Sequence, residues 1–262
     1  MLIAKDIKVT LGHKEILHGV STSLAPAQLS VIVGPNGSGK TTLLRALTAE
    51  VPFAGQITLN GHDITRTPAW KLAAMRAVLP QATVLAFPFT VAEVVRLGQM
   101  GGIGAGGPDR TLDALHRVGL TGYADQFYSD LSGGEQQRVQ LARVLLQVWQ
   151  PISASGAPRW LILDEPVSSL DIGHQLMVMQ IARDFADQGG GVVAVMHDLN
   201  LSAMFADHMV LMRGGQIAAQ GLVKDVLVDD HLSNAYGCAL RVGVAPPERS
   251  IFILPQMAGT RG

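Results

Sequence analysis

The sequence predicts an α/β fold with a parallel central sheet, an antiparallel β layer near the N-terminus and an inserted all-α segment. Short apolar runs at 29–33, 161–163 and 192–196 are separated by helical stretches. This is the βαβ pattern of a parallel sheet that is covered on both faces. Alternating apolar and polar residues at 7–11 indicate half-buried strands, and helix-spaced apolar residues fill the region from about 85 to 150.

The predicted antiparallel layer rests on three segments, at 7–11, 16–21 and 56–60. The alternation of side chains in these segments favours a sheet with one face on the core. Further along the chain, residues 209–213 and 216–219 flank Gly214-Gly215, which predicts a closing hairpin with a tight turn.

The helical insertion is predicted to begin at Thr90, where Thr90-Val91-Ala92-Glu93 has the spacing of a capping box. We expect further helices at 111–118 and 135–148. Glycine-rich 101–107 is expected to be a flexible loop, and turn-rich 150–158 an exposed loop.

These features divide a single predicted domain, residues 1–262, into parts. The predicted divisions are an α/β core with its antiparallel layer at 1–84 and 151–240, a helical subdomain at 85–150, and a weakly ordered C-terminal tail at 241–262.

The composition excludes several classes of protein. The chain has 262 residues, 20 Lys and Arg against 21 Asp and Glu, and a net charge of −1, so it offers no electrostatic case for nucleic acid. Cys238 is the only cysteine, which rules out an internal disulfide framework. No apolar run is long enough for a signal peptide or a membrane span, so we expect a cytoplasmic protein.

The strongest motif is a phosphate-binding loop that matches G-x-x-x-x-G-K-[ST] between the predicted strand at 29–33 and a helix predicted from about Lys40 to Glu50. Glycines let backbone N–H groups curl around an anion, and the helix N-terminus adds partial positive charge. Lys40 is expected to reach the β- and γ-phosphates, Thr41 to bind Mg²⁺, and Thr42 to contact the α-phosphate. The residues concerned are Gly34, Pro35, Asn36, Gly37, Ser38, Gly39, Lys40, Thr41 and Thr42.

Two carboxylates, Asp164 and Glu165, follow the apolar strand at 161–163. Asp164 is expected to hold Mg²⁺, directly or through water, because this ion keeps several waters and takes few protein ligands. Glu165 lies one residue further on and is the candidate general base for the water that attacks the γ-phosphate. Taken alone, the pair also fits a solvated acidic turn.

The segment Leu131-Ser132-Gly133-Gly134-Glu135-Gln136-Gln137 resembles the signature of the ATP-binding cassette family. Further family elements occur in order: Gln81 fits the Q-loop, Glu165 the catalytic glutamate, 168–171 the D-loop and His197 the switch histidine. The resemblance covers about residues 1–240. It implies a P-loop NTPase core of the RecA-like type and an ATPase that uses ATP and Mg²⁺.

The family's mechanism is what this resemblance implies for individual residues. Two cassettes form a head-to-tail homodimer, and Ser132, Gly133 and Gly134 contact the nucleotide held by the partner's Lys40. Glu165, His197 and Gln81 act in catalysis, and Gln81 also senses the metal. Asp171 lies at the subunit seam. The cassette then closes on ATP and opens after hydrolysis.

Without its own membrane span, the chain resembles the separate ATPase subunit of a bacterial importer. Phe87-Pro88-Phe89 and the residues around His197 resemble importers of iron chelates, haem and cobalamin, and the 150–158 extension resembles the ATPases of haemin importers. The implied partners are two permease subunits and, indirectly, a periplasmic binding protein. The implied location is the cytoplasmic face of the inner membrane. Phe87 and Phe89 are expected either to line a permease groove or to be subdomain core.

Several alternatives remain open at this level. The cargo is haemin or, alternatively, a ferric siderophore or cobalamin. A soluble cassette acting on nucleic acid or ribosomes and a silent regulatory module that binds ATP are the rival classes. The family's adenine-stacking aromatic residue is missing, which leaves Leu11 or His13 to pack on the base and makes GTP worth testing. The remaining histidines are expected to be solvated or core residues: His18, His62, His116, His174, His208 and His231.

Overall fold

A six-stranded sheet forms the centre of the molecule, with the strand order β10-β9-β3-β8-β7-β6. In this computed structural model the described residues are 1–81, 87–100, 108–245, 251 and 253–255. The strands of the sheet are β3 (Gln28–Val33), β6 (Arg76–Leu79), β7 (Trp160–Asp164), β8 (Gly191–Val195), β9 (His208–Arg213) and β10 (Gln216–Leu222). All pairs are parallel except β9 with β10, which form the predicted hairpin. The parallel core is therefore confirmed.

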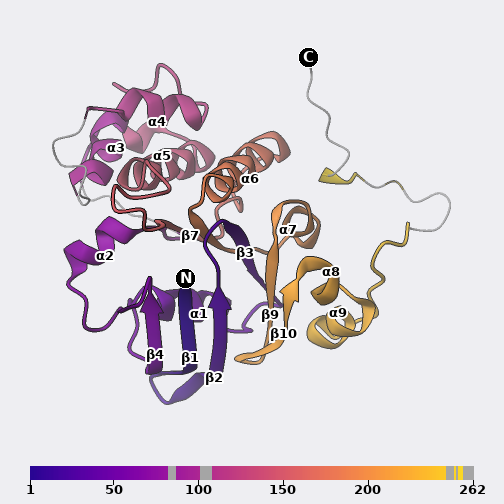
Figure 1. Ribbon diagram of the computed structural model, residues 1–262. Helices are drawn as coiled ribbons and strands as arrows, with labels where there is room; N and C mark the ends of the chain where they lie inside the picture. The colour runs from indigo at the N-terminus through magenta and orange to yellow at the C-terminus, as the bar shows by residue number, and fades with distance from the viewer. Residues whose placement is uncertain (82–86, 101–107, 246–250, 252, 256–262) are drawn as a thin grey trace.

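A second, four-stranded antiparallel sheet lies beside this core, in the order β2-β1-β4-β5 (Figure 1). Its strands are β1 (Leu2–Leu11), β2 (Lys14–Leu24), β4 (Ala54–Leu59) and β5 (His62–Asp63). β1 and β2 extend further than their alternating patterns predict. Backbone pairing continues from Leu2 opposite Leu24 to Leu11 opposite Lys14, because the ladder does not require apolar side chains at its exposed positions.

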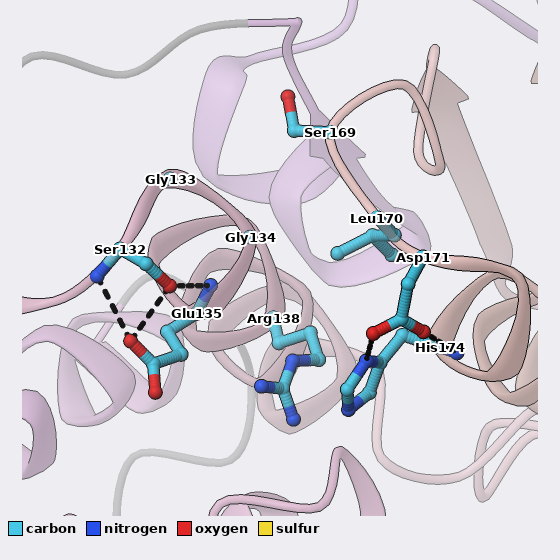
Figure 2. Close-up of a pocket in the computed structure, with 9 residues that line it drawn as sticks. All are labelled: Ser132, Gly133, Gly134, Glu135, Arg138, Ser169, Leu170, Asp171 and His174. Atoms are coloured by element: carbon cyan, nitrogen blue, oxygen red, sulfur yellow. Dashed lines mark hydrogen bonds and ion pairs between the residues drawn. The ribbon is translucent and has the colours of Figure 1, made fainter.

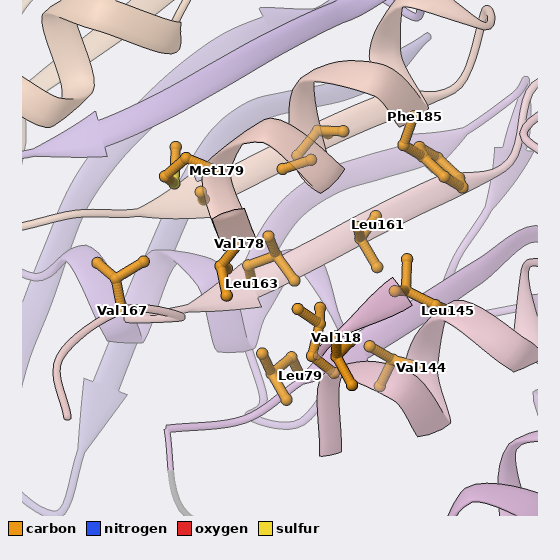
Figure 3. Close-up of a cluster of buried hydrophobic side chains, with 14 of the residues drawn as sticks. Leu79, Val118, Val144, Leu145, Leu161, Leu163, Val167, Val178, Met179 and Phe185 are labelled. Carbon is orange, nitrogen blue, oxygen red and sulfur yellow. The ribbon is translucent and has the colours of Figure 1, made fainter. Parts of the chain in front are cut away.

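The two faces of the parallel sheet bury separate hydrophobic clusters. Along β7, Leu161 and Leu163 point to one cluster, whereas Trp160 and Ile162 point to the other. The first cluster packs under the helices (Figure 3). The second lies between the sheet, α1 (Lys40–Leu47) and the antiparallel layer. Side chains alternate in this way because the strand has a period of two.

Helices cover the parallel sheet (Figure 1). The remaining helices are α2 (Ala69–Met75), α3 (Val91–Met100), α4 (Thr111–Arg117), η1 (Tyr128–Asp130), α5 (Gly133–Gln147), α6 (Ile172–Asp187), α7 (Leu199–Phe205), α8 (Val223–Val226) and α9 (Asp229–Tyr236). The capping box before α3 is confirmed, since Thr90 N–H donates to Glu93 Oε2 at 2.7 Å. No helix in these described segments is long and apolar enough to cross a membrane.

The helix after the phosphate loop ends at Leu47, three residues before the predicted end at Glu50. Ala49 has a positive φ of 56°, which breaks the helical path. Arg76 then binds two carbonyl oxygens at the end of the helix: its Nη1 donates to Leu47 O at 2.9 Å and its Nη2 donates to Thr48 O at 2.6 Å. Burial lowers the pKa of Arg76 to about 10, so the guanidinium stays charged at neutral pH.

The predicted exposed loop at 150–158 is only partly exposed. Its tip is exposed, but Ile152 and Pro158 are half-buried and form a β-bridge with each other. Within that bridge, Ser153 N–H donates to Ala157 O at 2.9 Å. The turn-forming residues therefore close a small hairpin instead of an open loop.

The predicted flexible loop at 101–107 and most of the predicted tail at 241–262 lie outside the described residues. The same holds for the boundary at 84–85 between the two predicted subdomains. The helices α3, α4 and α5 lie together at one end of the molecule (Figure 1). The division of the chain into core, helical subdomain and tail remains a prediction.

Candidate functional site

The phosphate loop joins β3 to α1, as its motif predicts. Gly39 caps α1 with a φ of 99°, and a Cβ atom there would lie 2.9 Å from Leu17 Cδ2. Glycine is required at this position for both reasons. Lys40 folds back over the loop, so that its Nζ donates to Gly34 O at 2.9 Å and to Pro35 O at 3.0 Å.

The loop has the properties of an anion site. The Ser38 hydroxyl is buried and has no hydrogen-bond partner, which is costly unless a ligand supplies one. A Cβ added to Gly37 would meet no atom within 4 Å, so the loop backbone is open on that side. Burial lowers the pKa of Lys40, while the nearby Glu165 and Asp164 oppose that shift. These features fit a bound phosphate chain.

Asp164 ends β7 directly beside the phosphate loop. Its Oδ1 lies 3.5 Å from Thr41 Oγ1. Burial, and secondly the charge of Glu165, raises the pKa of Asp164. A buried carboxylate without a cation is destabilised, and the Thr41 hydroxyl beside it supplies a second oxygen donor. This donor chemistry fits Mg²⁺.

Three predicted catalytic side chains converge on one point. The Glu165 carboxylate accepts a hydrogen bond from Gln81 Nε2 at 2.9 Å and contacts His197 Nε2 at 2.5 Å. These residues follow β7, β6 and β8, which are neighbours in the sheet. Carboxyl ends of parallel strands are where α/β folds place their sites. The prediction that the three residues act together is therefore compatible with their placement.

Gln137 is a residue of this site that the sequence reasoning did not assign. It lies on α5, the helix that begins at the signature, and its Nε2 donates to the backbone oxygen of Glu165 at 2.9 Å. Glu165 itself has a positive φ of 52°, which is strained for a residue with a side chain. The hydrogen bond from Gln137 therefore stabilises the strained backbone at Glu165. The position of Gln137 two residues after Glu135 in the motif is the only signal that pointed to it.

The signature residues line a separate cleft of about 540 Å³ (Figure 2). Its lining is Ser132, Gly133, Gly134, Glu135, Arg138, Ser169, Leu170, Asp171 and His174. None of the residues that line it belongs to the phosphate loop at 34–42, which the structure describes in full. One copy of the chain thus presents its phosphate loop and its signature at different places.

Ser132 caps α5, which therefore begins at Gly133, two residues before the predicted start at Glu135. Ser132 N–H donates to Glu135 Oε2 at 2.8 Å, and Glu135 N–H donates to Ser132 Oγ at 3.4 Å. Hydrogen bonds from Ser132 lower the pKa of Glu135. The glycines of the signature form the first turn, so their N–H groups face the cleft at the helix N-terminus.

The D-loop side of the cleft contains a pair that the sequence reasoning missed. His174 Nδ1 lies 2.8 Å from Asp171 Oδ2, and His174 N–H donates to Asp171 Oδ1 at 2.9 Å (Figure 2). These contacts lower the pKa of Asp171, and the hydrogen bond from the backbone N–H of His174 has the larger effect. His174 was expected to be a solvated or core residue; its side chain is 40% exposed, and it also pairs with Asp171. The i,i+3 spacing after a helix cap was the available signal.

The predicted base-contacting residues lie at the turn between β1 and β2. Leu11 is 43% exposed and His13 is exposed. Both are accessible to a ligand.

Replacing Ser132 with alanine is expected to destabilise the chain by about 1 kcal/mol, because the cap accepts one of the unpaired N–H groups of α5. Urea unfolding measures this. Ser129→Ala is the matched control, since that exposed hydroxyl donates to the carboxylate of the neighbouring Asp130. Equal losses in both variants would contradict the capping role.

A family profile described as "ABC transporter" matches residues 17–168. A protein of Roseobacter denitrificans named "Hemin import ATP-binding protein HmuV" is 60% identical over 257 residues, covering 98% of each chain. A protein of the same name in Rhizobium meliloti is 56% identical over 261 residues, covering 98% of this chain and 99% of its own.

Solved structures show the same fold. One described as the "Structure of ATP binding subunit of ABC transporter" has a TM-score of 0.75 at 22% identity and covers 91% of this chain and 94% of its own. One described as an inward-facing "putative metal-chelate type ABC transporter" also has a TM-score of 0.75 at 22% identity, with 96% and 94% covered.

Proposed function

Because this chain belongs to the ABC transporter family, we propose that it is the ATP-hydrolysing subunit that powers haemin import through a separate permease. The hydrolytic part rests on one observation, the convergence of Gln81 and His197 on the Glu165 carboxylate beside the phosphate loop. The cargo rests on the full-length similarity to proteins named for hemin import. The place of action that follows is the cytoplasmic face of the inner membrane.

The chemistry follows from these placements. Lys40 neutralises the β- and γ-phosphates, and the backbone N–H groups at 36–39 bind their oxygens. Glu165 takes a proton from the attacking water, and His197 and Gln81 orient the carboxylate and the water. Thr41 and Asp164, with Gln81 close by, would hold Mg²⁺, which supplies charge neutralisation on the phosphates.

The separation of the signature cleft from the phosphate loop supports a working homodimer. Ser132, Gly133 and Gly134 would bind the triphosphate held by the partner's Lys40, and Asp171 would lie at the seam. A ligand that contacts both copies favours the closed pair, and its hydrolysis removes that preference.

A second groove is the surface that we propose for binding the permease. It has a volume of about 470 Å³ and lies between the end of α1, α2 and the end of α5. Arg76 and Gln147 lie in its wall. The exposed Phe87 is a further candidate contact, whereas Phe89 packs against the core cluster. The core alternative therefore holds for Phe89, and the permease contact remains a proposal for Phe87.

Phe87→Ser is expected to weaken association with the permease several-fold without affecting folding, because this side chain is 71% exposed. Copurification from membranes that contain the cognate permease measures the effect. Leu222→Ser, at an exposed apolar residue on β10, is the control. Normal copurification of Phe87→Ser would remove Phe87 from the interface.

The cargo is tested by reconstituting the chain with its permease and binding protein in liposomes. Haemin-loaded binding protein is expected to stimulate ATP hydrolysis, and a ferric siderophore or cobalamin is not. Stimulation by one of the latter alone would contradict the proposed cargo but leave ATP hydrolysis in place.

A further inference from the structure

A pocket with no part in the nucleotide site lies between the β4–β5 turn, α2 and the hairpin at 150–158. We call it the loop pocket; its volume is about 300 Å³. The residues that define it are His62, Trp70, Lys71, Met75, Pro158 and Arg159. This volume lies at the lower end of the range for small-molecule sites. None of these residues belongs to the phosphate loop, to the catalytic group around Glu165 or to the signature cleft.

The hairpin forms a fixed wall of the loop pocket. Asn60 Nδ2 donates to Pro158 O at 2.8 Å, and Trp160 Nε1 donates to Asn60 Oδ1 at 3.1 Å. Arg159 N–H donates to Pro151 O at 2.7 Å, which closes the base of the hairpin. Since Trp160 is fully buried, the wall is anchored in the core. A ligand would therefore meet a preformed surface.

The lining combines an aromatic surface with positive charge. The Trp70 side chain is 69% exposed, an unusual position for so large an apolar group. Met75 and Pro158 add further apolar surface. Lys71 and Arg159 supply two cations. All residues that line the loop pocket belong to the described part of the chain, and none of them is acidic.

Arg159 has hydrogen-bonding capacity left over. Its Nη1 donates to Gln150 O at 3.1 Å, but its Nε is buried and has no acceptor. A buried N–H of a cation without an acceptor is unfavourable. A guanidinium in this situation pairs well with a carboxylate, which offers planar oxygens at the matching spacing.

We propose that the loop pocket binds a planar aromatic carboxylate, with its ring against Trp70 and its carboxylate on Lys71 and Arg159. A helical peptide fits less well, because a helix is about 10–12 Å wide and needs a long groove. Haemin is a planar ring with two carboxylates, so it is the first ligand to test. That choice of ligand rests on the proposed function, whereas the ligand class rests on the lining alone. A porphyrin exceeds the cavity, so only one edge of its ring enters.

The test is equilibrium binding to the isolated full-length chain, measured by calorimetry. The probes are haemin, metal-free protoporphyrin IX and 2-naphthoate. At least one is expected to bind saturably at one site per chain. Lys71→Gln with Arg159→Gln is expected to weaken that binding at least about tenfold, the effect of losing bonds to a charged group. Trp70→Ala is expected to weaken it as well. The controls are Lys224→Gln, for loss of a cation elsewhere, and Phe127→Ala, for loss of another exposed aromatic ring.

Each outcome decides the proposal. Porphyrin binding that is lost in the loop-pocket variants and kept in the controls supports it and identifies a porphyrin as the ligand. The same pattern with 2-naphthoate alone supports it with a smaller aromatic acid as the ligand. Binding that is absent for all probes, or equally affected by the control variants, overturns it. Because no permease is present, failure here leaves the proposed import function untouched, and ATP turnover of each variant without ligand confirms an intact cassette.

Discussion

Glu165→Gln is expected to lower the rate of ATP hydrolysis by about 10²–10⁴-fold while ATP binding persists. The amide keeps the shape of the side chain and can still contact Gln81 and His197, but it cannot take a proton from water. Steady-state phosphate release measures the rate. Size-exclusion chromatography with ATP and Mg²⁺ is expected to show an accumulated dimer, because the triphosphate that joins the two copies is no longer cleaved.

Glu15→Gln is the matched control, since this carboxylate lies on the surface of β2 and its side chain is 48% exposed. Its turnover is expected to equal that of the parent chain. If Glu165→Gln hydrolyses ATP at the parental rate, Glu165 is not the base. If the parent chain itself lacks turnover with and without permease, the chain is a silent ATP-binding module.

Lys40→Met is expected to weaken ATP binding by at least about 2 kcal/mol, or about thirtyfold, because it removes the buried cation that faces the phosphates. A fluorescent ATP analogue measures the affinity. The ammonium also donates to Gly34 O and Pro35 O, so part of the loss comes from a less ordered loop.

Circular dichroism is expected to show that this variant is folded. Lys5→Met, at an exposed residue of β1, is the control and should bind ATP normally. Unchanged affinity in Lys40→Met would show that the phosphates do not lie in the loop.

The predictions that were correct concern segments in which the local preference for a strand or a turn agrees with the packing of the whole fold. Apolar runs such as 161–163 can only be buried on both faces, and the glycines of the phosphate loop permit few backbone paths. The fold class and the strands beside the site were predictable for this reason.

The predictions were wrong or incomplete where contacts between residues far apart in the sequence decide the structure. The end of α1 depends on Arg76, which is 29 residues from Leu47. The contact of Gln137 with the Glu165 carbonyl spans 28 residues. The residue types at 150–158 are those of an ordinary exposed loop. The segment becomes a fixed wall of the loop pocket because Asn60 and the buried Trp160 hold it in place. No periodic pattern carries that information.

The groove proposed for the permease has a wall that joins the ends of two helices. Arg76 binds the carbonyls at the end of α1, and Gln147, at the end of α5, donates to Ala73 O at 2.9 Å and to Arg76 O at 3.0 Å. The opposite ends of these helices, about 12 Å and about 22 Å away along their axes, are the lysine of the phosphate loop and the glycines of the signature. A small displacement imposed at this junction would therefore tilt both nucleotide-contacting tips at once, so one mechanical input from the membrane would reach both ATP molecules of a dimer.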